Sequence, residues 1–180
     1  MPIDFCLSTL DNKNMKRLLF VIFACLSLCS YAQAPFNTEV VNGSFSSLKG
    51  QTANLEIVYN KIHGMPESDF AKYESDWNVD KPEIESLIWS KANDAVKSMC
   101  HLNMGEKADL TVRIVVNSVS VKGDHSFEIQ LLDKSGEVLG KIQALFGKGG
   151  MFGTKLNLIK DGAKSTGKRA GAMLKKYMNM

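Results

Sequence analysis

The chain has 180 residues, of which 44% are hydrophobic and 23% are charged, as is usual for one globular domain. This composition excludes a disordered chain, a collagen-like chain and a small protein that depends on disulfides. The formal net charge of +3 is too small to indicate nucleic acid as a partner.

Residues 15–32 have the three-part pattern of a secretory signal peptide. A short basic segment is followed by the apolar run 18–28, and small residues stand at the −3 and −1 positions of a cut after Ala32. The apolar run is shorter than the about 20 residues of a membrane span. We therefore predict a periplasmic or extracellular protein whose residues 1–32 are an upstream mis-start and then the signal peptide, with Met15 as the true start.

Three of the four cysteines, Cys6, Cys25 and Cys29, lie in or before the predicted signal peptide. Cleavage would leave Cys100 alone, so no disulfide could form within the mature chain. We expect a buried, unreactive thiol at Cys100, with an intermolecular disulfide or a reactive thiol as the alternative. Residues 22–25 partly match the cleavage motif of lipoproteins, so a lipid anchor is the alternative to soluble export.

The rest of the chain is expected to form a loose, polar lead-in at 33–52 and a single domain at 53–180. Alternating strand-forming residues predict a first strand at 55–59. Residues 63–77 contain Gly and Pro and are expected to be a loop.

A helix is predicted from Asp80 to about Met99. Asp80 is a favoured N-cap, and Pro82 suits the first turn because its missing N–H needs no partner there. Apolar residues then recur with the spacing of one buried helix face: Ile84, Leu87, Ile88, Ala92, Ala95, Val96 and Met99.

Alternating β-branched and aromatic residues predict three consecutive antiparallel strands, at 110–121, 127–131 and 138–146. Between the second and third, the sequence Asp-Lys-Ser-Gly at 133–136 is a strong hairpin signal. Alternation along the third strand places Ala144 and Phe146 on the same face as Ile142.

A glycine-rich joint at 147–153 leads to a second predicted helix, whose apolar stripe is Leu156, Ile159, Ala163, Ala170, Leu174 and Tyr177. Gly162, Gly167 and Gly171 interrupt this helix, at about 0.5–1 kcal/mol each relative to Ala. We expect these glycines to let the segment move, and the helix to depend on tertiary packing.

Together the elements predict an α+β fold: a single, mainly antiparallel sheet of about four strands with two helices on one face, in the order β-α-β-β-β-α. The other face of the sheet is expected to be wet, because it carries polar side chains: Glu56, Arg113, Asn117, Glu128 and Gln130.

The hairpin sequence Leu-Leu-Asp-Lys-Ser-Gly-Glu-Val-Leu-Gly at 131–140, within this order of elements, resembles small periplasmic α/β domains of envelope proteins. Examples are the amino-terminal domain of the translocation protein TolB and the lipoprotein activators of penicillin-binding proteins. The resemblance covers about residues 110–180. It implies a non-enzymatic module for assembly or binding.

Three near-motifs have more ordinary explanations. Residues 162–169 resemble a phosphate-binding P-loop, but Arg169 replaces the hydroxyl residue that would bind magnesium. Residues 99–101, together with Met104, offer soft copper ligands without a recognised spacing. Residues 124–126, Asp-His-Ser, have the types of a catalytic triad, but adjacency in sequence does not give its geometry. We therefore predict no catalytic residue, no metal and no cofactor.

Charge is distributed unevenly along the chain. Residues 33–147 carry 11 basic and 16 acidic side chains, whereas residues 148–180 carry 8 basic and 1 acidic. Lys160, Lys164 and Lys168 recur beside the apolar stripe and are expected to form an exposed basic ridge. The candidate partners are lipid head groups, an acidic polysaccharide or an acidic envelope protein. Export disfavours nucleic acid, and a merely solvated face is the alternative.

These features favour an exported, non-enzymatic binding or assembly module of the bacterial cell envelope, without a membrane span. The alternatives are a carrier of a small ligand or lipid, and a hydrolase whose site is not visible in the sequence. A buried apolar cavity would favour the carrier, and a deep pocket with convergent polar groups would favour the hydrolase.

Overall fold

The computed structural model describes residues 39–180. The predicted start at Met15, the signal peptide up to Ala32 and the cysteines at positions 6, 25 and 29 lie outside the described residues. Within 39–180, no helix combines the length and the apolar character that crossing a bilayer requires.

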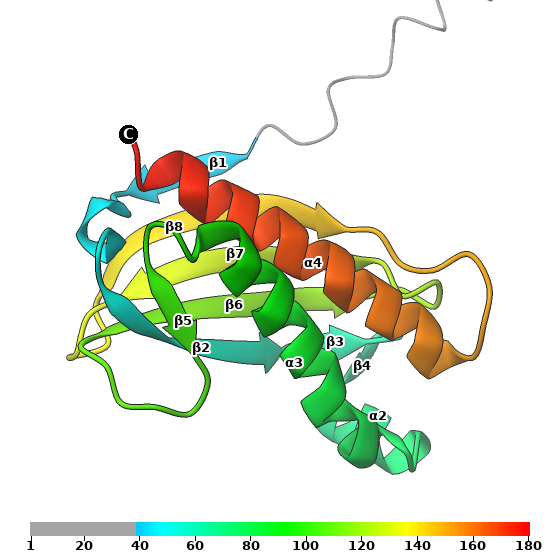
Figure 1. Ribbon diagram of the computed structural model, residues 1–180. Coiled ribbons are helices and arrows are strands. Elements are labelled where there is room, and N and C mark those ends of the chain that lie inside the picture. Colours follow the sequence, from blue (N-terminus) through cyan, green and yellow to red (C-terminus); the bar gives the residue numbers. More distant parts are fainter. Residues whose placement is uncertain (1–38) are drawn as a thin grey trace, which may run out of the picture. The chain divides into compact units, whose positions relative to one another are not determined.

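The fold is α+β, with an eight-stranded mixed sheet. Helices α3 (Trp77–Val96) and α4 (Lys155–Tyr177) lie side by side across one face of the sheet (Figure 1). The other helices are α2 (Glu67–Tyr73) and the 3-10 turn η1 (Ser46–Leu48). The strands are β1 (Val40–Gly43), β2 (Thr52–Tyr59), β3 (Lys61–Ile62), β4 (Met65–Pro66), β5 (His101–Asn103), β6 (Leu110–Val119), β7 (His125–Leu132) and β8 (Val138–Gly147).

The strand order β1-β8-β7-β6-β2-β5 corrects the prediction of about four mainly antiparallel strands. Strands β6, β7 and β8 are antiparallel neighbours as predicted. However, β2 is parallel to both β6 and β5, because the chain passes from β2 through α3 before it returns, and such a crossover joins parallel strands. The strands missed from the sequence have two to four residues each, too few to show a period.

The predicted loose lead-in at 33–52 is wrong for the part that the structure describes. Strand β1 pairs with β8, and the chain then turns through η1. Phe45 and Leu48 are fully buried in the core. Residues 39–52 therefore belong to the domain, and their two large apolar side chains anchor them to it.

Helix α3 begins at Trp77 rather than at Asp80, and Pro82 lies inside it. The Trp77 side chain is fully buried, and its Nε1–H donates to Glu67 Oε1 at 3.1 Å. This anchor extends the helix towards its N-terminus. The predicted loop at 63–77 instead contains β4 and α2. The helix ends at Val96 instead of about Met99. Its apolar stripe is confirmed up to that residue, although Leu87 and Ala95 are only half-buried.

The glycines of α4 are points of close contact with the rest of the domain. The expectation that they let the segment move stays a prediction. A Cβ on Gly162 would lie 1.9 Å from the carbonyl oxygen of Gly123. A Cβ on Gly167 would lie 2.4 Å from the carbonyl oxygen of Ile88 in α3. Since real Cβ atoms do not approach other atoms so closely, only glycine lets α4 pack against α3 and the β6–β7 turn.

A bulge in β8 corrects the predicted alternation. Ala144 has a φ of +58°, and the register with β7 shifts at this point. As a result Ala144 and Phe146 are exposed, and Leu145 takes the core position instead. A β-bulge re-aims the side chains that follow it.

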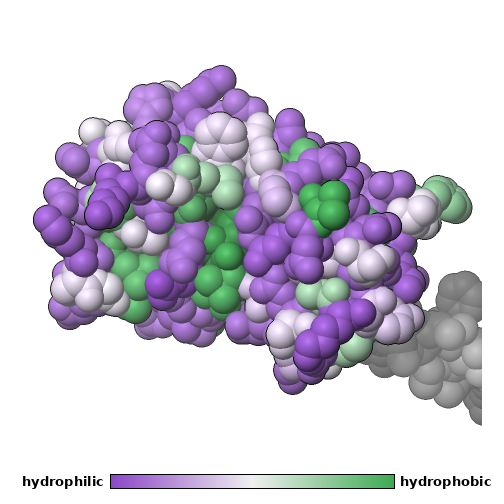
Figure 2. All heavy atoms as spheres, turned by 90° about the horizontal axis from the view of Figure 1, so that it is seen from below, coloured by the Kyte–Doolittle hydropathy of each residue, from purple (hydrophilic) through white to green (hydrophobic). Residues whose placement is uncertain are grey.

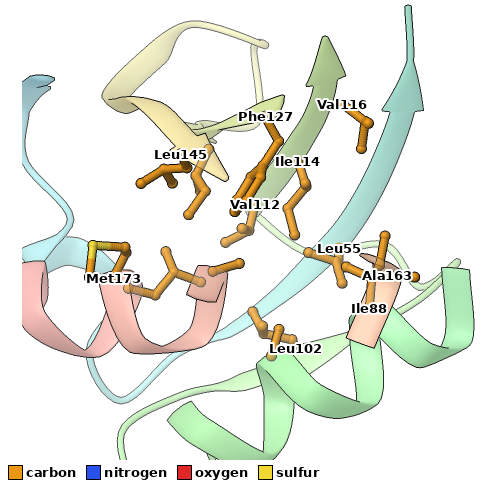
Figure 3. Close-up of a cluster of buried hydrophobic side chains, with 14 of the residues drawn as sticks. Leu55, Ile88, Leu102, Val112, Ile114, Val116, Phe127, Leu145, Ala163 and Met173 are labelled. Atoms are coloured by element: carbon orange, nitrogen blue, oxygen red, sulfur yellow. The ribbon is translucent and has the colours of Figure 1, made fainter. Parts of the chain in front are cut away.

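The core lies between the sheet and the two long helices. Side chains from β2, β5, β6, β7 and β8 and from both helices point towards one another there (Figure 3). The labelled examples are Leu55, Val112, Ile114, Phe127, Ile88 and Ala163, all 2% exposed or less. This packing sets the position of α4, which carries the predicted basic residues.

Candidate functional site

Lys160 does not belong to an exposed ridge. Its side chain is only 18% exposed, and Nζ lies 2.6 Å from Glu83 Oε2 and 3.2 Å from Asp80 Oδ1. The hydrogen bond with Glu83 is the main reason that the pKa of Lys160 is raised. Lys160 thus joins α4 to the beginning of α3, so the expectation that its side chain is exposed is wrong.

Several other basic residues of the C-terminal segment also have carboxylate partners within the fold. Lys155 lies 3.5 Å from Glu74. Arg169 and Lys176 both reach Glu39, at 3.5 and 2.6 Å. Part of the uneven charge along the sequence therefore stabilises the fold, because basic side chains of α4 form ion pairs with acidic side chains from the rest of the domain.

What remains is an exposed basic face on the outer side of α4, formed by Lys164, Lys168 and Lys175. At about 100° per residue these three positions fall within about 40° of one another. Lys164 pairs with Asp161 of the same helix at 3.0 Å. Lys168 and Lys175 have no carboxylate within 4.0 Å among residues 39–180. We call this set the α4 basic face.

Lys175 is the member that sequence reasoning missed. It lies seven residues after Lys168, a spacing that returns to the same side of a helix. The four-residue spacing that led to Lys160 instead drifts around the helix, into contact with α3. The sequence contains both spacings, of four and of seven residues. Only the packing of α4 shows that the seven-residue spacing marks the outer side of the helix.

The inner side of α4 is fixed by the fold. Thr154 caps the helix by accepting a hydrogen bond from the N–H of Asn157 at 3.3 Å. Thr166 Oγ1 hydrogen-bonds His125 Nδ1 of β7 at 3.0 Å, and both side chains are fully buried. These contacts on the inner side fix the rotation of α4 about its own axis. They thereby fix the direction in which the α4 basic face points.

The open face of the sheet is polar, as predicted. Arg113 Nε donates to Glu56 Oε2 at 2.7 Å. Burial acts to raise the pKa of Glu128, but hydrogen bonds from Lys141 and Gln130 outweigh it, so this pKa is lowered. These groups satisfy one another, which leaves fewer free donors and acceptors for a partner than on the α4 basic face.

The residues of the three near-motifs do not come together as reactive sites. Residues 162–169 lie inside α4 and not in a loop between a strand and a helix. Cys100 is buried as predicted, and burial raises the pKa of its thiol to about 11. Asp124 accepts hydrogen bonds from Ser120 Oγ and from the N–H of Gly149, while His125 faces Thr166. Among residues 39–180 no group of three or more metal-binding side chains forms.

Two hollows at the surface are lined mainly by polar side chains. One hollow, of about 620 Å³, has mostly exposed polar residues around the 104–109 loop, including Lys107, Asp109 and Lys134. A second, of about 410 Å³, lies at the start of α4 beside Glu74 and Lys155.

From the side on which α2 lies in Figure 1, the surface is mainly hydrophilic, with hydrophobic atoms in a few patches (Figure 2).

Comparison with known proteins gives distant structural likenesses only. No family model and no curated protein matches the chain. Among solved structures, the chain is similar to a PelC dodecamer from Paraburkholderia phytofirmans, with 12% identity, 74% of this chain and 98% of that chain covered, and a TM-score of 0.42. A substituted PelC dodecamer from the same organism has 15% identity, covers 74% and 99% of the two chains, and has a TM-score of 0.37. Neither is a TolB domain or an activator of penicillin-binding proteins, so that resemblance stays a prediction.

Proposed function

We propose that this protein is an exported, non-enzymatic binding module of the bacterial cell envelope, and that the α4 basic face holds an anionic partner. The observation that carries the proposal is the alignment of Lys164, Lys168 and Lys175 on the outer side of one helix, with two of them lacking a carboxylate partner among residues 39–180. The signal-peptide pattern at 15–32 supports export.

The shape of the face favours an extended anionic chain, such as an acidic polysaccharide. Lys164 and Lys175 are 11 positions apart, which is about 16 Å along a helix. A row of positive charges of this length suits a partner that repeats its negative charges along one direction. The lysines supply attraction and position rather than chemistry, since each presents a hydrated ammonium group on a flexible stem.

The test compares two triple variants that change the net charge equally. One is Lys164→Gln, Lys168→Gln and Lys175→Gln. The other changes Lys72, Lys97 and Lys134, which are exposed elsewhere on the domain, to Gln. Binding to immobilised polygalacturonate and to envelope fractions is measured over a salt gradient.

We expect the α4 variant to lose most of its retention at low salt, whereas the control variant keeps it. Retention of the wild type should fall with salt, because the Debye length shrinks from about 10 Å at 0.1 M to about 3 Å at 1 M. Both variants should unfold at the temperature of the wild type, since exposed substitutions usually change stability by about 0.5 kcal/mol or less. Equal retention of all three proteins would contradict the proposal.

A further inference from the structure

The loop between β8 and α4, residues 148–154, exposes two large apolar side chains at one end of the domain. Met151 is 80% exposed and Phe152 is 85% exposed. Figure 1 shows this loop projecting beyond the sheet. The β6–β7 turn, which contacts the loop, adds Val121 at 70% exposed. We call these three residues the apolar tip.

The backbone beneath the apolar tip is anchored on both sides. The N–H of Gly149 donates to Asp124 Oδ1, and the N–H of Lys148 donates to Ser165 Oγ, each at 2.9 Å. A Cβ on Gly149 would lie 2.0 Å from the carbonyl oxygen of Lys122, so the loop is pressed against the β6–β7 turn. The fold therefore fixes the backbone at 148–149, shortly before the exposed side chains of Met151 and Phe152.

Positive charge flanks the apolar tip. Lys122 and Lys148 are exposed, and neither has a carboxylate within 4.0 Å among residues 39–180. Asp124, the acidic residue closest to them in the turn, already accepts hydrogen bonds from Ser120 and Gly149. Apolar side chains flanked by unpaired lysines are the composition of segments that lie in the interface of anionic membranes.

The apolar tip is too small for a stable protein interface. Only Phe152 is aromatic, and an aromatic side chain buries about 150–250 Å². Since Met151 and Val121 are no larger, the three side chains together offer on the order of 500 Å². A stable interface buries about 800 Å² on each partner. A lipid surface has no such requirement, because it adapts to a convex tip, accepts a few side chains among its acyl chains and attracts lysines through its head groups.

We propose that the apolar tip inserts into a lipid surface that carries anionic head groups, and that Lys122 and Lys148 contact those head groups. This contact uses different residues from the α4 basic face and does not depend on the proposed polysaccharide. A domain that touched lipid at the tip would present the α4 basic face at a defined distance from the membrane.

The most specific test places a fluorophore at the tip. Phe152→Trp is mixed with vesicles of phosphatidylglycerol and phosphatidylcholine, and the emission of the unchanged protein, which contains Trp77 and Trp89, is subtracted. We expect a blue shift and quenching by brominated lipids, with little change on vesicles of phosphatidylcholine alone. Unchanged emission at position 152 with vesicles that bind the protein would overturn the proposal.

Matched variants locate the contact further. Met151→Ser with Phe152→Ser should weaken co-sedimentation with anionic vesicles about tenfold or more, and Lys122→Gln with Lys148→Gln should weaken it on anionic vesicles only. Val79→Ser removes an equally exposed apolar side chain from α3, at 78%, and should have no effect. All proteins are compared with the same N-terminus, so that any contribution of residues 1–38 cancels.

Two further readouts separate this proposal from its rivals. The Met151→Ser, Phe152→Ser variant should keep full retention on polygalacturonate, so that failure of the polysaccharide proposal and failure of the lipid proposal are seen independently. Sedimentation velocity without lipid tests whether the apolar tip instead binds a second copy of this chain. If the wild type associates and the double variant does not, the tip docks on a second copy of this chain and the lipid proposal is wrong.

Discussion

Helices α3 and α4 cover the same face of the same sheet and both bury large apolar side chains, but the close backbone contacts of α4 are made by its glycines. Helix α3 is held by large side chains such as Trp77 and Ile88, which are fully buried. Helix α4 meets α3 and the β6–β7 turn through Gly162 and Gly167, where no Cβ fits. Removing side-chain volume should weaken the packing of α3, whereas adding a Cβ should weaken the glycine contacts of α4. The outer lysines Lys168 and Lys175 are exposed and take no part in either contact.

The largest effect should come from adding one methyl group to the inner side of α4. Gly162→Ala would place Cβ 1.9 Å from a backbone oxygen of the β6–β7 turn, which cannot move aside as a flexible side chain can. We expect a loss of about 3 kcal/mol or more, at the upper end of overpacking, measured by denaturant unfolding. The gain in helix propensity, about 0.5–1 kcal/mol, is too small to compensate.

The other two glycines provide the graded comparison for this prediction. The nearest atom to an added Cβ is 2.4 Å away at Gly167 and 2.6 Å away at Gly171. The cost of Ala should therefore decrease from position 162 to 167 to 171. Stabilisation by any of the three substitutions would show that α4 is not packed in this way.

Loss of volume is the corresponding test of α3. Ile88→Ala should cost about 2–5 kcal/mol, because the side chain is fully buried and leaves a cavity. Leu87 is only half-buried, so Leu87→Ala should cost less, about 2 kcal/mol or below. Equal costs at positions 87 and 88 would mean that the observed face of α3 is wrong.

Acid should weaken the contact between α4 and β7. Burial lowers the pKa of His125 from 6.5 to about 4. Between these values the unfolded chain binds a proton that the folded chain does not, so the free energy of unfolding falls as the pH falls, by up to about 3 kcal/mol. His63, whose pKa burial also lowers, acts in the same direction.

Comparison of the wild type with His125→Leu isolates this histidine. Below pH 6.5, the ordinary pKa of a histidine, and down to about pH 5, the free energy of unfolding should fall less steeply in the variant. The carboxyl groups whose pKa is lowered, such as Glu39 and Glu128, titrate below their ordinary 4.5 and so matter mainly at lower pH. Identical slopes would mean that His125 binds a proton in the folded protein.

The smallest effect should separate the structural lysine from those of the α4 basic face. Lys160→Gln removes two contacts with α3 and should cost up to about 1 kcal/mol, as ion pairs near the surface do. Lys168→Gln should leave stability within about 0.5 kcal/mol of the wild type. If position 168 were the more costly of the two, its assignment to a free outer face would be wrong.

The sequence predicted the features that repeat along the chain. The stripe of α3, the three antiparallel strands, the polar open face of the sheet and the buried Cys100 all follow from local patterns. The parallel pairing of β2 depends on the path through α3, and the shift at Ala144 depends on one backbone angle of +58°. The pairing of Lys160 with Asp80 joins residues 80 positions apart, so only tertiary packing could show that this lysine is not available to a partner.

The most direct test of the α4 basic face uses a photo-crosslinking amino acid in living cells. The residue is placed in turn at position 168 on the face and at position 72 on α2, where the lysine is also exposed. Adducts are then sought by mass after irradiation and purification. We predict an adduct with an anionic envelope component from position 168 and none from position 72. Adducts from position 72 alone would contradict the assignment of the partner to the α4 basic face.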